Sequence, residues 1–175
     1  MIDPASHKTT GYHLFLEPEG KLREEVAAII GSLATQFDGP LFSPHVTLLA
    51  RIPDQEEAVL IEKTKQLTRS LTPFEVVLGT VDIEQAHFRA LYLHVVSEEI
   101  KNACQRANEL FSMQDEREYV PHMSLLYGNY AEAQKREVAS MLEVPVDCSF
   151  VVNKLHLYKT DGEMSNWVKI AEVPF

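Results

Sequence analysis

The residues best suited to chemistry in this sequence are two pairs of the same kind: His45 with Thr47, and His122 with Ser124. The two histidines stand 77 positions apart, and a proline precedes each of them. On an extended strand, side chains two residues apart point to the same face, so each pair places an imidazole beside a hydroxyl. Two such pairs suggest one symmetric site that is suited to the chemistry of phosphate esters.

Histidine ionises near neutral pH, so one imidazole can accept a proton while its twin donates one. Hydrolysis of a cyclic phosphodiester needs both roles at once, with water activated on one side of phosphorus and the leaving oxygen protonated on the other. Thr47 and Ser124 would donate to the non-bridging oxygens, where negative charge concentrates in the transition state. We therefore predict that His45, His122, Thr47 and Ser124 are catalytic, with no metal and no other cofactor.

Two rival readings of these residues have less support. A zinc site usually takes three or four ligands that include Cys, Asp or Glu, and neither pair has a carboxylate within two residues. A serine triad would need a nucleophile elbow, and Ser124 on one strand with His122 would point alongside that imidazole. A lone His-x-Thr is weak evidence, but both pairs follow an aromatic-x-Pro sequence and precede two leucines.

The other histidines have no partner hydroxyl at a matching place, so we expect structural or surface roles for them. His94 shares a strand face with Tyr92, and either the cleft or its rim fits that face. This group consists of His7, in an N-terminal segment expected to fray, and His13, His87, His94 and His156.

Composition is typical of a globular protein of one domain. Of the 175 residues, 45% are apolar, and no apolar run reaches the ~18 residues of a membrane span. We expect a cytoplasmic monomer that does not bind membranes and whose two cysteines are reduced. Sixteen basic and twenty-six acidic residues give a net charge of −10, which disfavours a long nucleic acid as partner and leaves a small phosphate ester possible.

Periodicity predicts the same order of elements twice along the chain. The first half has strands at 12–16, 44–52 and 74–81 and helices over 22–33 and 54–71, with Asp54 as the expected N-cap. The second half has strands at 91–95, 121–130 and 149–158 and helices over 97–111 and 131–142. A last strand at 167–173 completes a sheet.

The halves correspond at nearly constant offsets, which indicates a duplication. Tyr12 matches Tyr92 at an offset of 80, His45 matches His122 at 77, and 74–77 matches 150–152 at 76. We predict an α+β fold of two β-α-β-α-β lobes related by a pseudo-two-fold axis, with the motif strands on opposite walls of a central cleft and helices outside. The whole chain, 1–175, would form one bilobal catalytic domain, with lobe one at about 11–84 plus the C-terminal strand and lobe two at about 88–160.

These features resemble the two-histidine (2H) phosphoesterase superfamily, defined by paired H-x-[T/S]-x motifs in a duplicated, LigT-like fold. The sequence is more narrowly similar to the cyclic phosphodiesterase branch of plants and yeast, and the similarity covers nearly the whole chain. It is carried by the segments 37–47, 119–127 and 155–161 and by Trp167.

This resemblance implies a metal-independent hydrolase of small cyclic phosphates. Its substrates would be nucleoside 2′,3′-cyclic phosphates, opened to 2′-phosphates, and ADP-ribose 1″,2″-cyclic phosphate. His45 and His122 carry over as the catalytic pair, and Thr47 and Ser124 as the hydroxyls that hold phosphate. We assign His122 as the base and His45 as the acid for release of the 3′ oxygen, although pseudo-symmetry leaves the reverse open.

The resemblance also implies two substrate-binding residues. Tyr127 matches a tyrosine that helps to bind substrate, although an odd-step neighbour of Ser124 points away on a regular strand, so this role needs a bulge or twist. Phe88 matches an aromatic position that stacks on the base, with core packing as the alternative. The aromatic-rich segment of that branch reads Gln-Ala-His-Phe-Arg at 85–89 here, which leaves the base preference open.

Two further functions remain possible from the sequence. One keeps the chemistry but acts on RNA, either on terminal 2′,3′-cyclic phosphates or as a 3′-end exonuclease, and the acidic balance disfavours it. The other is a binding module for AMP-like ligands without turnover, which two complete motifs disfavour. Incubation with a cyclic nucleotide in EDTA separates an enzyme from a module.

Overall fold

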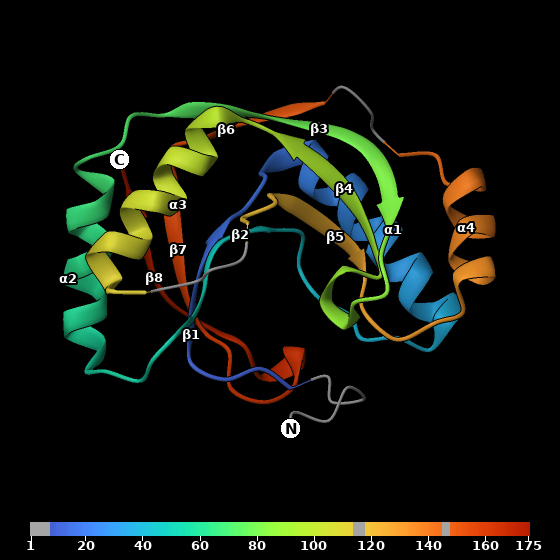
Figure 1. Cartoon of the computed structure of the whole chain (residues 1–175), viewed down its shortest axis with the longest axis horizontal. Coiled ribbons are helices and arrows are strands. Elements are labelled where there is room, and N and C mark those ends of the chain that lie inside the picture. The colour runs from blue at the N-terminus through green and yellow to red at the C-terminus, as the bar shows by residue number, and fades with distance from the viewer. Residues whose placement is uncertain (1–7, 114–117, 145–147) are drawn as a thin grey trace.

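A computed structural model of the chain describes residues 8–113, 118–144 and 148–175, and His7 lies outside them. Within these residues, four α-helices and one eight-stranded sheet form the predicted α+β fold (Figure 1). The strands are β1 (Tyr12–Leu16), β2 (Val46–Ile52), β3 (Phe74–Ile83), β4 (Leu91–Val96), β5 (His122–Leu126), β6 (Ser149–Val152), β7 (Lys154–Lys159) and β8 (Val168–Pro174). The helices are α1 (Gly20–Phe37), α2 (Glu57–Thr68), α3 (Glu98–Phe111) and α4 (Glu132–Met141). None of these helices has the length and apolar character needed to cross a membrane.

The sheet is symmetric about the two strands that carry the motifs. Its order is β6-β3-β4-β5-β2-β1-β7-β8, and neighbouring strands run antiparallel. β2 pairs with β5 through Val46 and Met123, each the residue after a motif histidine. The two motifs therefore lie on neighbouring strands of one sheet, whereas the sequence suggested opposite walls of a cleft.

The halves of the sheet do not coincide with the halves of the chain. β3 follows α2 along the chain but pairs with β4 and β6, whereas β7 and β8 continue the sheet from β1. Helix α1 packs on β5 and α3 packs on β2, so Figure 1 shows α2 with α3 at one side and α1 with α4 at the other. The predicted boundaries at 11–84 and 88–160 follow chain order. Periodicity reveals which face of a strand is buried but not which strand lies beside it. The sequence therefore does not show that β3 pairs with strands of the second half of the chain and β7 with a strand of the first.

Some predicted bounds are wrong for local reasons. The strand expected over 149–158 is divided at Asn153 into β6, which pairs with β3, and β7, which pairs with β1. Helix α2 begins at Glu57 after Glu56, and Asp54 is not its N-cap. The start of α3 agrees with its prediction, because the Ser97 hydroxyl accepts a hydrogen bond from the backbone N–H of Ile100.

The register corrects one of the anchors of the repeat. Phe15 lies opposite Thr47 on β1 and β2, and Tyr92 lies opposite Ser124 on β4 and β5. Phe15, not Tyr12, is therefore the counterpart of Tyr92, and the offset is 77, the same as for the histidines. Tyr12 and Phe15 are both aromatic and stand three residues apart, so the sequence pattern alone did not show which of them corresponds to Tyr92.

The two faces of the central strands differ in chemistry. Val46, Leu48, Met123 and Leu125 are almost fully buried, on the side where α1 and α3 pack. Alternation along the strands places the histidine and hydroxyl of each motif on the opposite face. The apolar residues thus hold the strands together while the polar residues share one surface.

Backbone conformation makes Gly11 important for joining β1 to β2. Its φ is +81°, and an added Cβ would lie 2.5 Å from the backbone oxygen of Ile52. We expect Gly11→Ala to lower the free energy of unfolding by more than about 1 kcal/mol, measured by urea denaturation. Gly31→Ala in α1 is the matched control, because its added methyl meets nothing within 4 Å and should stabilise the helix by about 0.5–1 kcal/mol. Equal effects of the two substitutions would contradict this account.

Candidate active site

The His45 imidazole is buried just before β2, and its hydrogen bonds determine its tautomer. Nδ1 lies 2.7 Å from the backbone oxygen of Ser43, which can only accept, so Nδ1 carries the proton. Burial lowers the pKa of His45 to about 4, although the hydrogen bond to Ser43 and the Glu17 carboxylate act to raise it. The free protein therefore presents a neutral imidazole with an unprotonated Nε2 at pH 7.

His122 repeats this arrangement at the start of β5. Its Nδ1 lies 2.8 Å from the backbone oxygen of Val120, so Nε2 is again the unprotonated nitrogen of the neutral ring. Burial lowers the pKa of His122, and the hydrogen bond to Val120 opposes that change. His122 is only half-buried, whereas His45 is 6% exposed, so the two imidazoles differ in their contact with water.

The register brings each histidine to the hydroxyl of the other motif. Continuing the pairing of Val46 with Met123 by one position places His45 opposite Ser124 and Thr47 opposite His122. Directly opposed residues in an antiparallel pair have Cβ atoms about 4.5–5.5 Å apart. Consistent with this proximity, the charge of His122 acts to lower the pKa of His45. The sheet therefore brings the four predicted residues together on one surface.

Tyr127 connects the two motifs. Its hydroxyl lies 3.4 Å from Nε2 of His45, a long hydrogen bond. Burial raises the pKa of Tyr127, which keeps the phenol protonated, and a hydrogen bond with Ser124 opposes that rise. Strand β5 ends at Leu126, so the alternation that would direct Tyr127 away from the site no longer applies. No bulge is needed, because the residue lies beyond the strand.

Backbone contacts hold the motif hydroxyls and their strands. The Ser124 hydroxyl donates to the backbone oxygen of Phe88 at 2.9 Å, so it must turn before it can donate to a phosphate. Tyr119, the aromatic residue of the aromatic-x-Pro sequence before the second motif, donates its hydroxyl hydrogen to the backbone oxygen of Thr47 at 2.8 Å. Each motif is thus tied to a segment from another part of the chain.

The Phe88 ring packs within the protein. It lies in the short 3-10 helix His87–Arg89 and meets Tyr127 edge-on, with ring centroids 5.3 Å apart. Tyr127 in turn stacks on Phe42 at 3.9 Å. These contacts favour the packing alternative for Phe88 in the free protein. The backbone oxygen of Phe88 contacts the second motif, because it accepts the hydrogen bond from the Ser124 hydroxyl.

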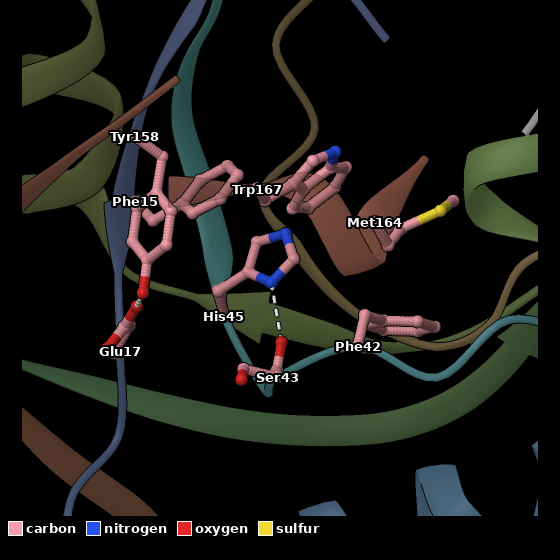
Figure 2. A pocket seen from close by; sticks show the side chains of 8 residues that line it. All are labelled: Phe15, Glu17, Phe42, Ser43, His45, Tyr158, Met164 and Trp167. Carbon is pink, nitrogen blue, oxygen red and sulfur yellow. Dashed lines mark hydrogen bonds between the residues drawn. The ribbon is translucent and has the colours of Figure 1, made fainter. Parts of the chain in front are cut away.

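A cavity lies beside His45 (Figure 2). It is small, with a volume of about 80 Å³, and it is open to solvent. Figure 2 shows the His45 ring among aromatic side chains, with Phe15 stacked on it at 4.0 Å and Trp167 edge-on at 6.0 Å. The lining residues are Phe15, Glu17, Phe42, Ser43, His45, Tyr158, Met164 and Trp167. His122, Thr47 and Ser124 are not among them, so the cavity adjoins the site on the His45 side.

Of the other histidines, His13 and His156 are buried away from the motifs, whereas His94 pairs with His122. Burial lowers the pKa of His13 to about 3, and its Nδ1 lies 2.7 Å from the hydroxyl of Thr160. His94 pairs with Asp82 at 3.1 Å on the β4 side of His122, which places it at the site and not in a separate core. His156 is buried 3.7 Å from Glu17. In the described parts of the chain, no three His, Cys, Asp or Glu side chains are grouped as metal ligands.

Sequence reasoning did not identify Glu17 and Tyr158, which line the cavity and share a hydrogen bond of 2.5 Å. A signal for Glu17 exists, because an acidic residue directly follows the apolar strand β1 and alternates in phase with His13 and Phe15. Tyr158 falls on the same face of β7, opposite His13. Only the pairing of β1 with β7 reveals that these residues meet.

The tautomers of both motif histidines can be measured directly. At pH 6 we expect His45 to be neutral with its proton on Nδ1, and His122 to prefer the same nitrogen when neutral, because both face backbone oxygens through Nδ1. Long-range ¹H–¹⁵N spectra of the imidazoles distinguish the tautomers. A proton on Nε2 of neutral His45 would contradict this geometry.

Comparisons with known proteins identify the family of this chain. The chain matches the family model described as the 2′-5′ RNA ligase superfamily over residues 18–163. It is 26% identical over 170 residues to a protein of Arabidopsis thaliana named cyclic phosphodiesterase, with 91% of this chain and 92% of the relative covered. The match to this superfamily supports a phosphoesterase activity for the chain.

Solved structures show the same fold. Ligand-free LigT of E. coli superposes with a TM-score of 0.65 at 12% identity, covering 95% of this chain and 98% of LigT. The protein TT0787 of Thermus thermophilus gives a TM-score of 0.64 at 14% identity, with 93% and 97% covered. Identities this low establish likeness of fold alone. The family match over most of its length shows that the chain belongs to the 2′-5′ RNA ligase superfamily, the two-histidine phosphoesterases that its paired motifs resemble.

Proposed function

We propose that the protein hydrolyses small cyclic phosphodiesters without a metal ion. Its substrates would be nucleoside 2′,3′-cyclic phosphates, opened to 2′-phosphates, and ADP-ribose 1″,2″-cyclic phosphate. The observation that carries this proposal is the placement of two imidazoles, each with Nε2 unprotonated, beside two hydroxyls on one face of paired strands. The relative named cyclic phosphodiesterase supports the same substrate class.

The reaction uses one imidazole as base and the other as acid. The base removes a proton from water through Nε2, and the water oxygen bonds to phosphorus. The bond from phosphorus to the 3′ oxygen breaks, and the acid donates its Nε2 proton to that oxygen. The base gains one proton and the acid loses one, so the net charge of the protein does not change. Transfer of a proton from the base to the acid through solvent then restores the starting protonation state.

The hydroxyl groups serve the non-bridging oxygens in this proposal. Thr47 and Ser124 donate to them as negative charge develops, with Ser124 turning away from the Phe88 oxygen. Tyr127 stays protonated and can transfer its hydrogen bond from His45 to the phosphate. Phe88 remains a proposed contact for the base, which would require its ring to move from Tyr127.

Electrostatics favour a small substrate over a long strand. The net charge of −10 repels a polyphosphate chain, and carboxylates of Glu17 and Glu84 lie near the two histidines. A long single strand needs a basic groove that follows its backbone. We therefore propose a small-molecule partner.

Substitution of the histidines tests the proposed function. His45→Ala and His122→Ala should each reduce kcat for 2′,3′-cyclic AMP by about 10²- to 10⁴-fold in buffer with EDTA, while near-ultraviolet circular dichroism stays unchanged. The double variant should lose little beyond the worse single variant, because the two groups act in one step. Near-normal turnover in both single variants, or loss of wild-type turnover in EDTA, would overturn the proposal.

The lowered pKa values predict the pH dependence. The reaction needs the pair to hold one proton, and burial lowers both pKa values below 6.5, that of His45 to about 4. As pH rises above about 6.5, the singly protonated pair disappears, so kcat/KM should fall about tenfold per pH unit. Initial rates from pH 4 to 9 measure this profile. An optimum at pH 8 or above would show that the free protein does not carry two depressed imidazoles.

A further inference from the structure

Arg89 is a cation that lies beside the second motif. It ends the short 3-10 helix His87–Arg89, between β3 and β4, and its side chain is 26% exposed. Its guanidinium carbon lies over the Tyr92 ring, 5.5 Å from the ring centre. Tyr92 also meets the His122 imidazole edge-on, with ring centroids 5.5 Å apart. The guanidinium and a motif imidazole thus pack against the same aromatic ring.

The strands place this aromatic ring on the face that carries the motif residues. Tyr92 lies opposite Ser124 on β4 and β5, and side chains of directly opposed residues point to the same face of a sheet. Burial is the main cause of the lowered pKa of His122, and the charge of Arg89 acts in the same direction. The guanidinium is therefore close enough to act on a charge at the site.

Hydrogen bonds hold the backbone of the short helix against the second motif. The Ser124 hydroxyl donates to the backbone oxygen of Phe88, the residue before Arg89, at 2.9 Å. The backbone N–H of Gly128, just after β5, donates to the backbone oxygen of His87 at 2.8 Å. The Arg89 side chain therefore extends from a backbone that is fixed beside the motif.

In the free protein, Arg89 is bound to Glu84. Its Nε donates to a carboxylate oxygen of Glu84, and this hydrogen bond lowers the pKa of Glu84, so the carboxylate is ionised at pH 7. The Glu84 side chain is 40% exposed, and exposed ion pairs are weak. Asp82, near the end of β3, is bound to His94 at 3.1 Å. A phosphate at the motifs therefore has only an exposed carboxylate to displace from Arg89.

The cations on the side of the first motif are bound to a buried charge. Lys169 and Arg23 lie 3.0 and 3.6 Å from the Glu17 carboxylate, whose side chain is only 2% exposed. Moving either cation to a ligand would leave a buried carboxylate with less compensation, which is costly. Arg89 is therefore the easier of these cations for a substrate to recruit.

Resting on the proposed function, we propose that Arg89 is a substrate-binding residue that leaves Glu84 and binds the phosphate group held by the two motifs. A guanidinium matches two phosphate oxygens with parallel N–H donors. It adds to the hydroxyls of Thr47 and Ser124 at the non-bridging oxygens. The cyclic diester carries one negative charge and the monoester product carries more, so Arg89 supplies the positive charge that a protein of net charge −10 needs at this site.

Binding of inorganic phosphate tests this role without turnover. Arg89→Gln should raise the Kd of phosphate at pH 7 by about tenfold, and Arg89→Lys, which keeps the charge, should raise it by less. Isothermal titration calorimetry measures both values. Arg136→Gln is the matched control, because it removes an arginine from an ion pair with Glu132 on α4, and it should change Kd by less than about twofold. Equal effects of Arg89→Gln and Arg136→Gln, or no phosphate binding by the wild-type protein, would overturn the proposal.

Glu84→Gln separates ligand binding from structural support. It breaks the same ion pair but releases Arg89 for the ligand, so the Kd of phosphate should fall by about threefold. A rise like that of Arg89→Gln would mean that the pair only holds the structure, which contradicts the proposal. In the Arg89→Gln protein, Glu84→Gln should give little of this gain, because no guanidinium remains to be released. The same gain in both backgrounds would show that Glu84 acts on the ligand by itself, and would refute the exchange.

Steady-state kinetics test the same role in turnover. For 2′,3′-cyclic AMP, Arg89→Gln should lower kcat/KM by about tenfold with most of the change in KM, because the charge acts on bound substrate as well as on the transition state. An unchanged KM and kcat/KM in the folded variant would refute the proposal. If Arg89→Gln does not fold, Arg89→Lys and Glu84→Gln decide, since they should shift Kd in opposite directions. A wild-type protein that binds phosphate through Arg89 but hydrolyses no cyclic phosphate would refute the proposed function and leave this binding role standing.

Discussion

The pairing of β2 with β5 is the contact on which the site depends. One antiparallel pair, Val46 with Met123, fixes the register in which each motif histidine faces the hydroxyl of the other motif. A slip of one residue would turn every motif side chain to the helix-covered face. Val46, Leu48, Met123 and Leu125 are almost fully buried on that face, so the same apolar packing that stabilises the sheet holds the motif side chains in place.

Burial then sets the chemistry of the two imidazoles. Each gives its Nδ1 proton to a backbone oxygen two residues earlier, and the motif itself thereby supplies the acceptor that fixes the tautomer. Desolvation lowers the pKa of both rings, so each can act as a base, and the acid needs a source of negative charge. In the proposed reaction, the substrate phosphate is such a source.

The sequence predicted the α+β fold and the repeat because alternation and helical periodicity are local properties. The four motif residues were also identifiable, since their types and spacing occur twice. The exchange of β3 and β7 between halves of the sheet depends on which strands become neighbours, which local periodicity does not encode. For the same reason, no pattern in the chain shows that Tyr158 hydrogen-bonds to Glu17, 141 residues away, or that Tyr119 of the aromatic-x-Pro sequence donates to Thr47, 72 residues away.

A crystal structure with inorganic phosphate bound tests the central claim most directly. The account predicts one phosphate with its oxygens about 2.6–3.2 Å from Nε2 of both His45 and His122, and with Thr47 and Ser124 as further donors. A phosphate held by a single histidine, or imidazoles too far apart to contact one phosphate together, would contradict it.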